Sequence, residues 1–302
     1  MIQLDNRHSL SKTYIPLNMI GNGAFGKVLL AENIKSCLLD AIKVIPKSQI
    51  KTWASNEKMN VPSLIVPYEA YLLEKLNHPN IIQFRDLFSD DKNFYICMEC
   101  PVSNWSNIQH PLSTKLKYLH PDFHESHSKD LFQFIELFDP IDESIVKHLF
   151  MQTFQAISYL HSLNIIHRDI KDQNILVDDH LNVKLIDFGN AIVIQNDKPL
   201  TDLYGTIQFC SPETLLHVPH FGKPTDIWAA GITLFLAMNR SLPFLDSDQV
   251  IHKQMDFKLN NRGSTDLKHL LSLLLTKEPT NRITIQEVIS HPWLKGLQCL
   301  CD

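Results

Sequence analysis

Glycine, cysteine and long apolar stretches are scarce in this chain of 302 residues, which has nine glycines and six cysteines. It contains no apolar run of eighteen or more residues, which argues against a membrane-spanning helix and favours a soluble protein. The cysteines, at 37, 97, 100, 210, 299 and 301, are scattered, which predicts reduced thiols in a cytoplasmic or nuclear setting. Charged side chains interrupt the first residues, so we expect no signal peptide.

Strong charge bias and internal repeats are also missing. The formal net charge of -5 gives no reason to expect nucleic-acid binding. The length is sufficient for a sizeable core divided between two lobes.

What the chain does contain is a dense polar stretch in its second half. Residues 167–174 read His-Arg-Asp-Ile-Lys-Asp-Gln-Asn, and Asp-Phe-Gly follows at 187–189. Together they match the eight fixed identities of the pattern H-R-D-x-K-x-x-N plus D-F-G, which makes chance agreement remote. Any one of these residues could simply cap a turn, but the whole set favours phosphoryl transfer.

The chemistry of phosphoryl transfer explains these residue types. Asp169 can orient an acceptor hydroxyl, and Lys171, two residues later, can reach the transferring phosphate. Asn174 and Asp187 can hold the Mg²⁺ ions that neutralise the phosphates. This stretch resembles the catalytic core of eukaryotic-type protein kinases, and Lys171 looks like their serine/threonine signature.

The resemblance covers about 14–295 and implies an α+β, bilobal fold. It implies a tail at 1–13, a small β-rich lobe at 14–98 with one αC helix, a larger, mainly helical lobe at 99–295, and a tail at 296–302. It also implies transfer of the γ-phosphoryl group of ATP, with Mg²⁺, to serine or threonine hydroxyls of protein substrates.

A glycine-rich stretch, Gly-Asn-Gly-Ala-Phe-Gly at 21–26, satisfies G-x-G-x-x-G, which dinucleotide-binding folds share. The apolar run that follows at 27–31 favours a β-hairpin over a helix N-terminus. Val28 after Lys27 excludes a Walker A loop, because no hydroxyl is left for magnesium. The resemblance implies that the following residues contact ATP: Ile20, Gly21, Asn22, Gly23, Ala24, Phe25, Gly26, Val28, Ala41, Lys43, Met98, Glu99, Cys100, Leu176 and Asp187.

Lys43, in Ala-Ile-Lys at 41–43, resembles the lysine that contacts the α- and β-phosphates. Its carboxylate partner is expected to be Glu69, on a short helix that starts near Pro67. Farther along, Asp142 is a plausible N-cap of a helix, and residues 227–238 predict a helix buried on every side. The resemblance implies two further contacts: a buried Glu213–Arg282 pair, and hydrogen bonds from the catalytic-loop backbone to Asp226.

Within the kinases, Asp172 and the phrases at 184–189 and 205–213 look like the PAS kinase and Pim branch of the calmodulin-dependent group. No PAS-like segment precedes the motifs, so we expect regulation by something other than a built-in PAS sensor.

In such kinases a phosphorylated residue usually neutralises the arginine that corresponds to Arg168. Asp202, four positions before Thr206, stands at that place, so we predict an Asp202–Arg168 pair and activity without activating phosphorylation. The alternative is a solvated Asp202 with Thr201 as the phosphosite. Thr206 is expected to bridge Asp169 and Lys171.

Asp130 matches one carboxylate of the pocket that selects arginine in related kinases, while Gln173 and Leu236 stand where acidic residues often lie. With Asp172 this predicts a modest preference for basic residues upstream of the target. An insertion at about 101–128 is expected to form a mobile partner-docking loop. Within it, His120, His124 and His127 form a candidate zinc site. We expect a monomer that binds neither membrane nor nucleic acid.

Two rival functions differ in class. A scaffold of pseudokinase type usually lacks Lys43, Asp169, Asn174 or Asp187, and all are present here. A small-molecule kinase of related fold is disfavoured by Glu213 and by Gly205-Thr206, which shape a peptide platform in the family.

Overall fold

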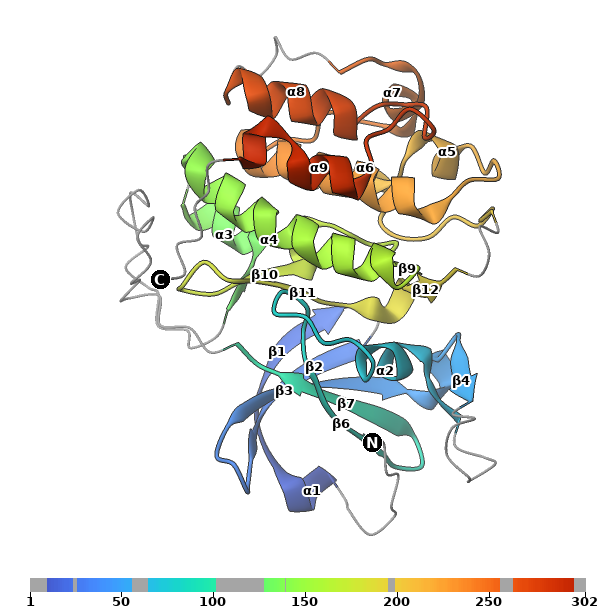
Figure 1. Ribbon diagram of the computed structural model, residues 1–302. Helices are drawn as coiled ribbons and strands as arrows, with labels where there is room; N and C mark the ends of the chain where they lie inside the picture. Colours follow the sequence, from blue (N-terminus) through green and yellow to red (C-terminus); the bar gives the residue numbers. More distant parts are fainter. Residues whose placement is uncertain are drawn as a thin grey trace. The chain divides into compact units, whose positions relative to one another are not determined.

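The computed structural model describes residues 10–23, 26–55, 65–101, 128–138, 140–194, 199–255 and 263–295. The chain divides into two compact units, Met1–Val102 and Ser103–Asp302. The first ends slightly beyond the lobe boundary expected at 98. The first unit is β-rich and the second mainly helical, so the predicted α+β class is confirmed (Figure 1).

The first unit is built on an antiparallel sheet of five strands in the order β1-β2-β3-β7-β6. These strands are β1 (Tyr14–Gly23), β2 (Gly26–Asn33), β3 (Leu39–Pro46), β6 (Phe84–Ser89) and β7 (Asn93–Glu99). The unit also contains α1 (Leu10–Thr13), η1 (Lys47–Gln49), the pair β4 (Trp53–Ser55) and β5 (Ile65–Pro67), and α2 (Tyr68–Leu73).

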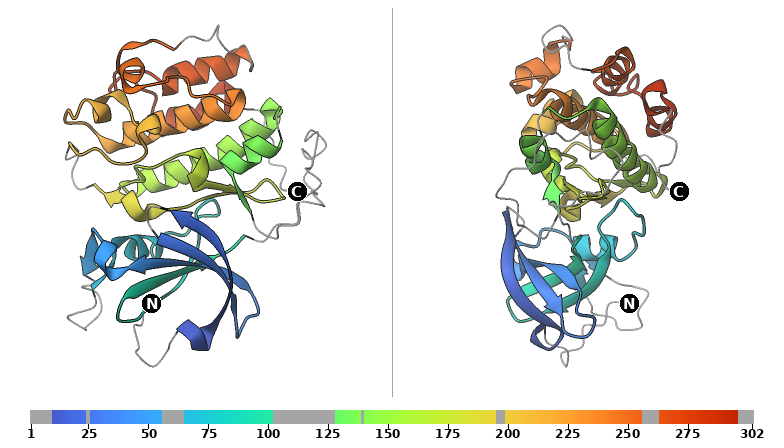
Figure 2. Two further views of the ribbon diagram at one scale, coloured as in Figure 1. Left: turned by 180° about the vertical axis from the view of Figure 1, so that it is seen from behind. Right: turned by 90° about the vertical axis from the view of Figure 1, so that its left-hand side faces the viewer.

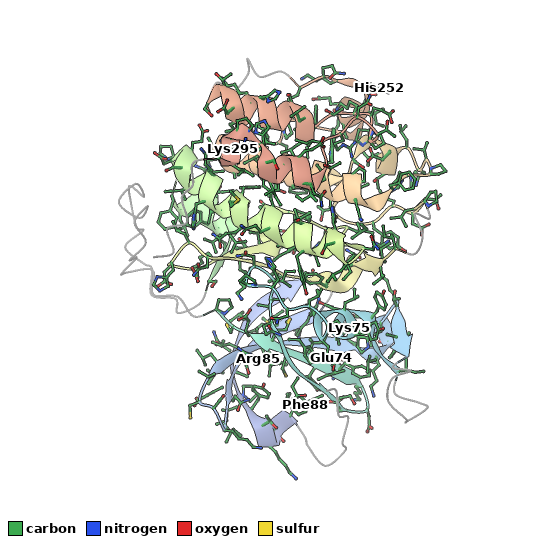
Figure 3. All side chains as sticks on the ribbon, viewed as in Figure 1. Glu74, Lys75, Arg85, Phe88, His252 and Lys295 are labelled. Atoms are coloured by element: carbon green, nitrogen blue, oxygen red, sulfur yellow. The ribbon has the colours of Figure 1, made fainter. Side chains whose placement is uncertain are left out.

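One face of this sheet carries its own small core. Alternate residues of a strand point to opposite faces, so Asp40 and Ile42 of β3 face away from Lys43. The Tyr14 hydroxyl donates to Asp40 Oδ2 at 2.9 Å, and its ring meets Phe88 edge to face. Burial raises the pKa of the Asp40 carboxyl, although Arg85 Nε lies 3.9 Å from Asp40 Oδ1. Figure 3 labels Arg85 and Phe88 on β6. The buried cluster consists of Tyr14, Ala31, Ile42, Phe88 and Cys97.

The second unit is organised around two long helices, α4 (Glu143–Ser162) and α6 (Gly222–Asn239), which contact each other (Figure 2). Asp142 caps α4 as predicted, accepting a hydrogen bond from the Ser144 N–H at 2.8 Å. In α6, residues 226–238 are buried except Leu236, which confirms the helix expected to be buried all round. The other α-helices described are α3 (Leu131–Leu137), α5 (Pro212–Leu215), α7 (Ser247–His252), α8 (Thr265–Leu274) and α9 (Ile285–Ser290).

Short strands and 3₁₀ turns, most of them between α4 and α5, position polar groups. A three-stranded sheet of order β11-β10-β8 contains β8 (Lys129–Asp130), β10 (Ile175–Val177) and β11 (Val183–Leu185). A second pair joins β9 (Ile165–Ile166) to β12 (Ile192–Val193). The 3₁₀ turns are η4 (Asp172–Asn174), η5 (Phe188–Asn190), η6 (Ile207–Phe209) and η7 (Pro292–Leu294).

A buried ion pair ties α5 to the chain before α9. Arg282 donates to Glu213 through both terminal nitrogens, at 2.7 and 2.9 Å, as the resemblance implied. The same guanidinium donates to three backbone carbonyls, so its donors are matched inside the core.

Four cysteines lie among the described residues, and all have free thiols: Cys37, Cys97, Cys100 and Cys210. Within the described ranges, no helix combines the length and the apolar character needed to cross a bilayer.

Candidate active site

The loop that follows β9 is held in place by hydrogen bonds from its backbone N–H groups. Asp226, buried in the first turns of α6, accepts hydrogen bonds from the N–H groups of His167 at 3.0 Å and Arg168 at 2.9 Å. It also contacts His161 Nε2 at 3.0 Å. Arg168 has a φ of 64°, a left-handed conformation that is uncommon outside glycine. Asp226 thus fixes the backbone immediately before Asp169.

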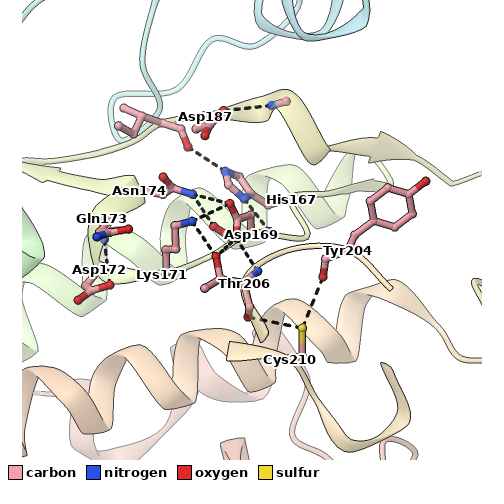
Figure 4. Close-up of polar contacts among 12 residues, drawn as sticks. His167, Asp169, Lys171, Asp172, Gln173, Asn174, Asp187, Tyr204, Thr206 and Cys210 are labelled. Carbon is pink, nitrogen blue, oxygen red and sulfur yellow. Dashed lines mark hydrogen bonds and ion pairs between the residues drawn. The ribbon is translucent and has the colours of Figure 1, made fainter. Parts of the chain in front are cut away.

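Asp169 is the centre of a network of polar contacts, which Figure 4 shows. Lys171 Nζ donates to Asp169 Oδ2 at 3.0 Å and to Thr206 Oγ1 at 2.8 Å. Thr206 donates to Asp169 Oδ1 through its hydroxyl at 3.0 Å and its N–H at 3.1 Å. Asn174 Nδ2 donates to Asp169 Oδ2 at 3.1 Å. Thr206 therefore bridges Asp169 and Lys171, as expected from the sequence.

Asn174 and Asp187 are brought near each other by the main chain. The N–H of Ile186 donates to the Asn174 carbonyl at 3.0 Å, and Asp187 follows directly with a φ of 62°. The His167 ring packs edge to face on Phe188 and contacts the Ile186 carbonyl at 3.0 Å. His167 therefore packs and orients this segment.

The oxygen donors of this segment fit Mg²⁺. Magnesium is commonly held by one or two protein oxygens together with substrate phosphates and water. The Asp187 carboxylate and the Asn174 side-chain carbonyl are donors of that type, since Asn174 uses its nitrogen toward Asp169. The described residues contain no cluster of three or more His, Cys, Asp or Glu side chains suited to a metal.

In the first unit, β3 and α2 bring a buried lysine and a buried glutamate together. Lys43 Nζ donates to both oxygens of Glu69, at 2.7 and 2.9 Å, and both side chains are nearly buried. Pro67 precedes the helix, so Glu69 falls in its first turn, as the sequence predicted.

The glycine-rich stretch is a hairpin between β1 and β2, in which Gly23 pairs with Gly26 and Gly21 with Val28. This geometry excludes the strand-to-helix turn of a dinucleotide-binding fold. Gly26 has a φ of 123°, and a Cβ there would lie 2.2 Å from the Val44 carbonyl oxygen. Only glycine fits this position.

The other residues expected at the nucleotide are distributed over both units. Ile20 and Asn22 lie on β1, Val28 on β2, Ala41 on β3, and Met98 and Glu99 on β7, with Cys100 directly after it. Ala41 pairs with Met98 in the sheet register. Leu176 lies on β10 of the second unit, while Ala24 and Phe25 fall outside the described residues.

The predicted Asp202–Arg168 ion pair is wrong for the conformation described. Asp202 is exposed and forms no ion pair in the described part of the chain, although it is near enough to raise the pKa of Arg168 electrostatically. The Arg168 guanidinium carbon instead lies 3.7 Å from the centroid of the Tyr204 ring. Its Nε donates to the Asn190 carbonyl at 2.5 Å.

Sequence reasoning did not identify Tyr204. The available signal was an aromatic residue two positions before Thr206, which no motif marks. Thr201, the alternative phosphosite, is exposed beside Asp202.

Two carboxylates lie close together at the start of α3. Asp130 caps this helix by accepting from the Gln133 N–H at 2.7 Å, and burial raises the pKa of its carboxyl. Burial also raises the pKa of Asp172, and the neighbouring charge of Asp130 adds to that shift. The three histidines considered for zinc and all but the ends of the 101–128 insertion lie outside the described residues.

Comparison with known proteins agrees with these observations. Residues 14–294 match the family described as the protein kinase domain, and the chain belongs to that family.

Similar curated proteins carry serine/threonine kinase names. The chain is 34% identical to serine/threonine-protein kinase PSK2 of Saccharomyces cerevisiae over 92% of this chain and 23% of that protein. It is 32% identical to the PAS domain-containing serine/threonine-protein kinase of Mus musculus, over 93% of this chain and 18% of the relative. It is 29% identical to serine/threonine-protein kinase pim-2 of Danio rerio, over 96% of this chain and 87% of that protein. The chain thus spans about a fifth of the PSK2 and PAS relatives, and most of the pim-2 relative.

Proposed function

We propose that this chain transfers the γ-phosphoryl group of ATP to serine and threonine hydroxyls of protein substrates. The observation that carries the proposal is the contact of Asp169 with Lys171, Thr206 and Asn174. It keeps one carboxylate oriented beside a cation, the arrangement needed to direct an acceptor hydroxyl at a phosphate. The names of the relatives support the same reaction.

Each group has a separate task in this proposal. Asp169 orients the acceptor hydroxyl and accepts its proton, while Lys171 neutralises charge that develops on the transferring group. Asn174 and Asp187 would hold Mg²⁺, which when bound draws charge from the phosphates of ATP. Lys43, oriented by Glu69, would contact the α- and β-phosphates.

The direct test is phosphate transfer from Mg²⁺-ATP to a peptide library that contains serine, threonine and tyrosine acceptors. We expect transfer to serine and threonine, and its loss by about 10³-fold or more in Asp169→Asn, which keeps the shape but loses the charge. Asp248→Asn, at a carboxylate that is 86% exposed on α7, is the matched control and should retain transfer. Binding of ATP without transfer in the wild-type chain would instead indicate a scaffold.

We further propose that transfer does not require a phosphate on the activation segment. The Thr206 contacts with Asp169 and Lys171 support this, because the hydroxyl, the carboxylate and the ammonium group form them without a phosphate. Phosphatase-treated protein should keep its activity, and Thr201→Ala should match the wild type. Loss of activity in both would establish Thr201 as an activating phosphosite.

We propose that the chain modestly prefers protein substrates with a basic residue upstream of the acceptor. The placement of the two carboxylates, Asp130 and Asp172, supports this: burial is the main cause of the raised pKa of Asp172, the charge of Asp130 adds to it, and a cation would relieve that second contribution. A peptide with arginine upstream should have a kcat/KM a fewfold above its alanine counterpart, and Asp172→Asn should reduce that ratio. An unchanged ratio would remove Asp172 from substrate selection.

We also propose a monomer that works in a reducing cytoplasmic or nuclear compartment, with the 101–128 segment as a docking site for a partner. The free thiols of the described cysteines support the reducing compartment. Light scattering of the purified chain would test the monomer, and deletion of 101–128 would test docking without loss of peptide phosphorylation.

A further inference from the structure

Arg168 is a cation next to the catalytic aspartate that has no ion pair in the described part of the chain. Its side chain contacts the Asn190 carbonyl, which accepts from Nε, and the face of the Tyr204 ring, 3.7 Å from the guanidinium carbon. Burial lowers the pKa of Arg168, and Tyr204, Asp226 and Asp202 oppose that shift. An aromatic face at this distance attracts a guanidinium through the ring quadrupole; here Tyr204 is 38% exposed and Arg168 is half-buried.

The backbone around Tyr204 is seated closely on the catalytic loop. Gly205 has a φ of 87°, and a Cβ at this position would lie 2.4 Å from the Arg168 carbonyl oxygen. The Cys210 thiol, which is buried, donates to the carbonyls of Tyr204 and Thr206, at 3.5 Å each. Arg168, Asp169, Tyr204, Thr206 and Cys210 also line one pocket of the second unit. The ring contact therefore lies in a segment that is already fitted to the loop.

Tyr204 is connected to the reacting carboxylate in two short steps. It lies two residues before Thr206, whose hydroxyl and N–H both donate to Asp169 Oδ1. On the other side, Arg168 directly precedes Asp169. Thr206 thus contacts Asp169 directly, and the contact between Tyr204 and Arg168 completes a closed set of interactions around Asp169.

We propose that Tyr204 is a positioning residue, whose ring binds the Arg168 guanidinium and holds the activation segment in place around Asp169. This inference rests on the proposed kinase function. It assigns to an aromatic face the role first predicted for the Asp202 carboxylate. A ring carries no net charge, so this contact depends on stacking geometry and is only weakly sensitive to salt.

The test uses phosphatase-treated protein whose unphosphorylated state is checked by mass spectrometry. Tyr204→Leu should lower kcat about tenfold with little change in KM for ATP, whereas Tyr204→Phe, which keeps the ring, should stay within about twofold of the wild type. Leu203→Ala, at the exposed neighbouring position, is the control for disturbance of the segment and should match the wild type. Equal activity of Tyr204→Leu and wild type would overturn the proposal, as would an equal loss in Tyr204→Phe.

A double-mutant cycle with Arg168→Gln separates the ring contact from general packing. In the Arg168→Gln background, Tyr204→Leu should cause no further loss, because the cation that the ring binds is gone. A loss of about tenfold in both backgrounds would mean that Tyr204 acts independently of Arg168, and the proposal would fail.

A readout that does not require kinase activity keeps this inference separate from the proposed function. Cys210 donates to the Tyr204 carbonyl, so release of Tyr204 should expose its thiol. Alkylation of Cys210, followed by mass spectrometry with exposed Cys37 as the internal reference, should be severalfold faster in Tyr204→Leu and unchanged in Tyr204→Phe. An inactive wild type with this labelling pattern would refute the kinase function alone, whereas equal labelling in all variants would refute the role of Tyr204.

Discussion

Arg282 and Arg240 show how the surroundings of a residue decide the energy of an ion pair. Arg282 is fully buried and donates to both oxygens of Glu213, while Arg240 contacts Glu136 from a position where both side chains are partly exposed. Removing one member of a buried pair leaves an uncompensated charge, but an exposed pair is largely screened by water.

Arg282→Met is therefore expected to lower the free energy of unfolding by about 3–5 kcal/mol, because Glu213 and three backbone carbonyls lose their donors. The matched change Arg240→Met should cost about 1 kcal/mol or less. Urea denaturation followed by circular dichroism would measure both. A loss of the same size in the two variants would contradict this account of the buried pair.

At the scale of elements, the β1–β2 hairpin depends on one glycine more than on another. Gly26 adopts a positive φ and faces the Val44 carbonyl, whereas a Cβ at Gly21 would meet Val28 Cβ at 3.4 Å with no unusual backbone angle. The sequence pattern treats these glycines alike, but their conformations differ.

We expect Gly26→Ala to destabilise the first unit by about 1–3 kcal/mol, through strain and the clash with backbone. Gly21→Ala should change stability by no more than about 1 kcal/mol. Hydrogen exchange of β1, β2 and β3 amides would report the difference locally. Equal protection in both variants would show that the hairpin tolerates a side chain at Gly26.

Two histidines in contact, His291 at the N-cap of η7 and His269 on α8, make the second unit sensitive to acid. His291 Nδ1 accepts from the Trp293 N–H at 3.1 Å, and its Nε2 lies 2.9 Å from His269 Nδ1. Burial, followed by the charge of His269, lowers the pKa of His291, while Asp266 opposes the shift. The folded chain therefore favours neutral His291.

Between the lowered pKa of folded His291 and its ordinary value of about 6.5, the unfolded chain binds more protons, so stability rises with pH in this window. The contribution is complete above about pH 6.5 and is lost as pH falls through the folded pKa. His291→Asn should flatten this part of the stability curve, whereas His252→Asn, at an exposed site on α7 (Figure 3), should not. Identical slopes in all three proteins would exclude His291 as the titrating group.

At the scale of the whole molecule, much of the architecture was predictable because local patterns and tertiary demands agree. Pro67 set the start of α2, Asp142 capped α4, and the uncharged run in α6 indicated burial on every side. The catalytic network followed from motif spacing. The partner of Arg168 did not, because spacing along an irregular segment does not determine which side chain turns toward the guanidinium.

The proposed reaction draws on both units, since Lys43 and Glu69 belong to the first and the Asp169 network to the second. Glu69→Gln should lower kcat/KM by about 10²-fold through loss of the charge that orients Lys43. The Cys210 alkylation rate should stay at the wild-type value, because the second unit keeps its own contacts. A changed alkylation rate would show that a substitution in the first unit alters the packing around Cys210 in the second.

The anchoring of the catalytic loop through Asp226 makes this protein a suitable scaffold for engineering. Asp226 accepts hydrogen bonds from the main-chain N–H groups of His167 and Arg168. Every residue except proline has such an N–H group. The backbone path of the catalytic loop therefore depends little on the side chains that the loop turns outward. Libraries at Gln173 and around Asp130 could be screened for new peptide selectivity without redesign of the catalytic centre.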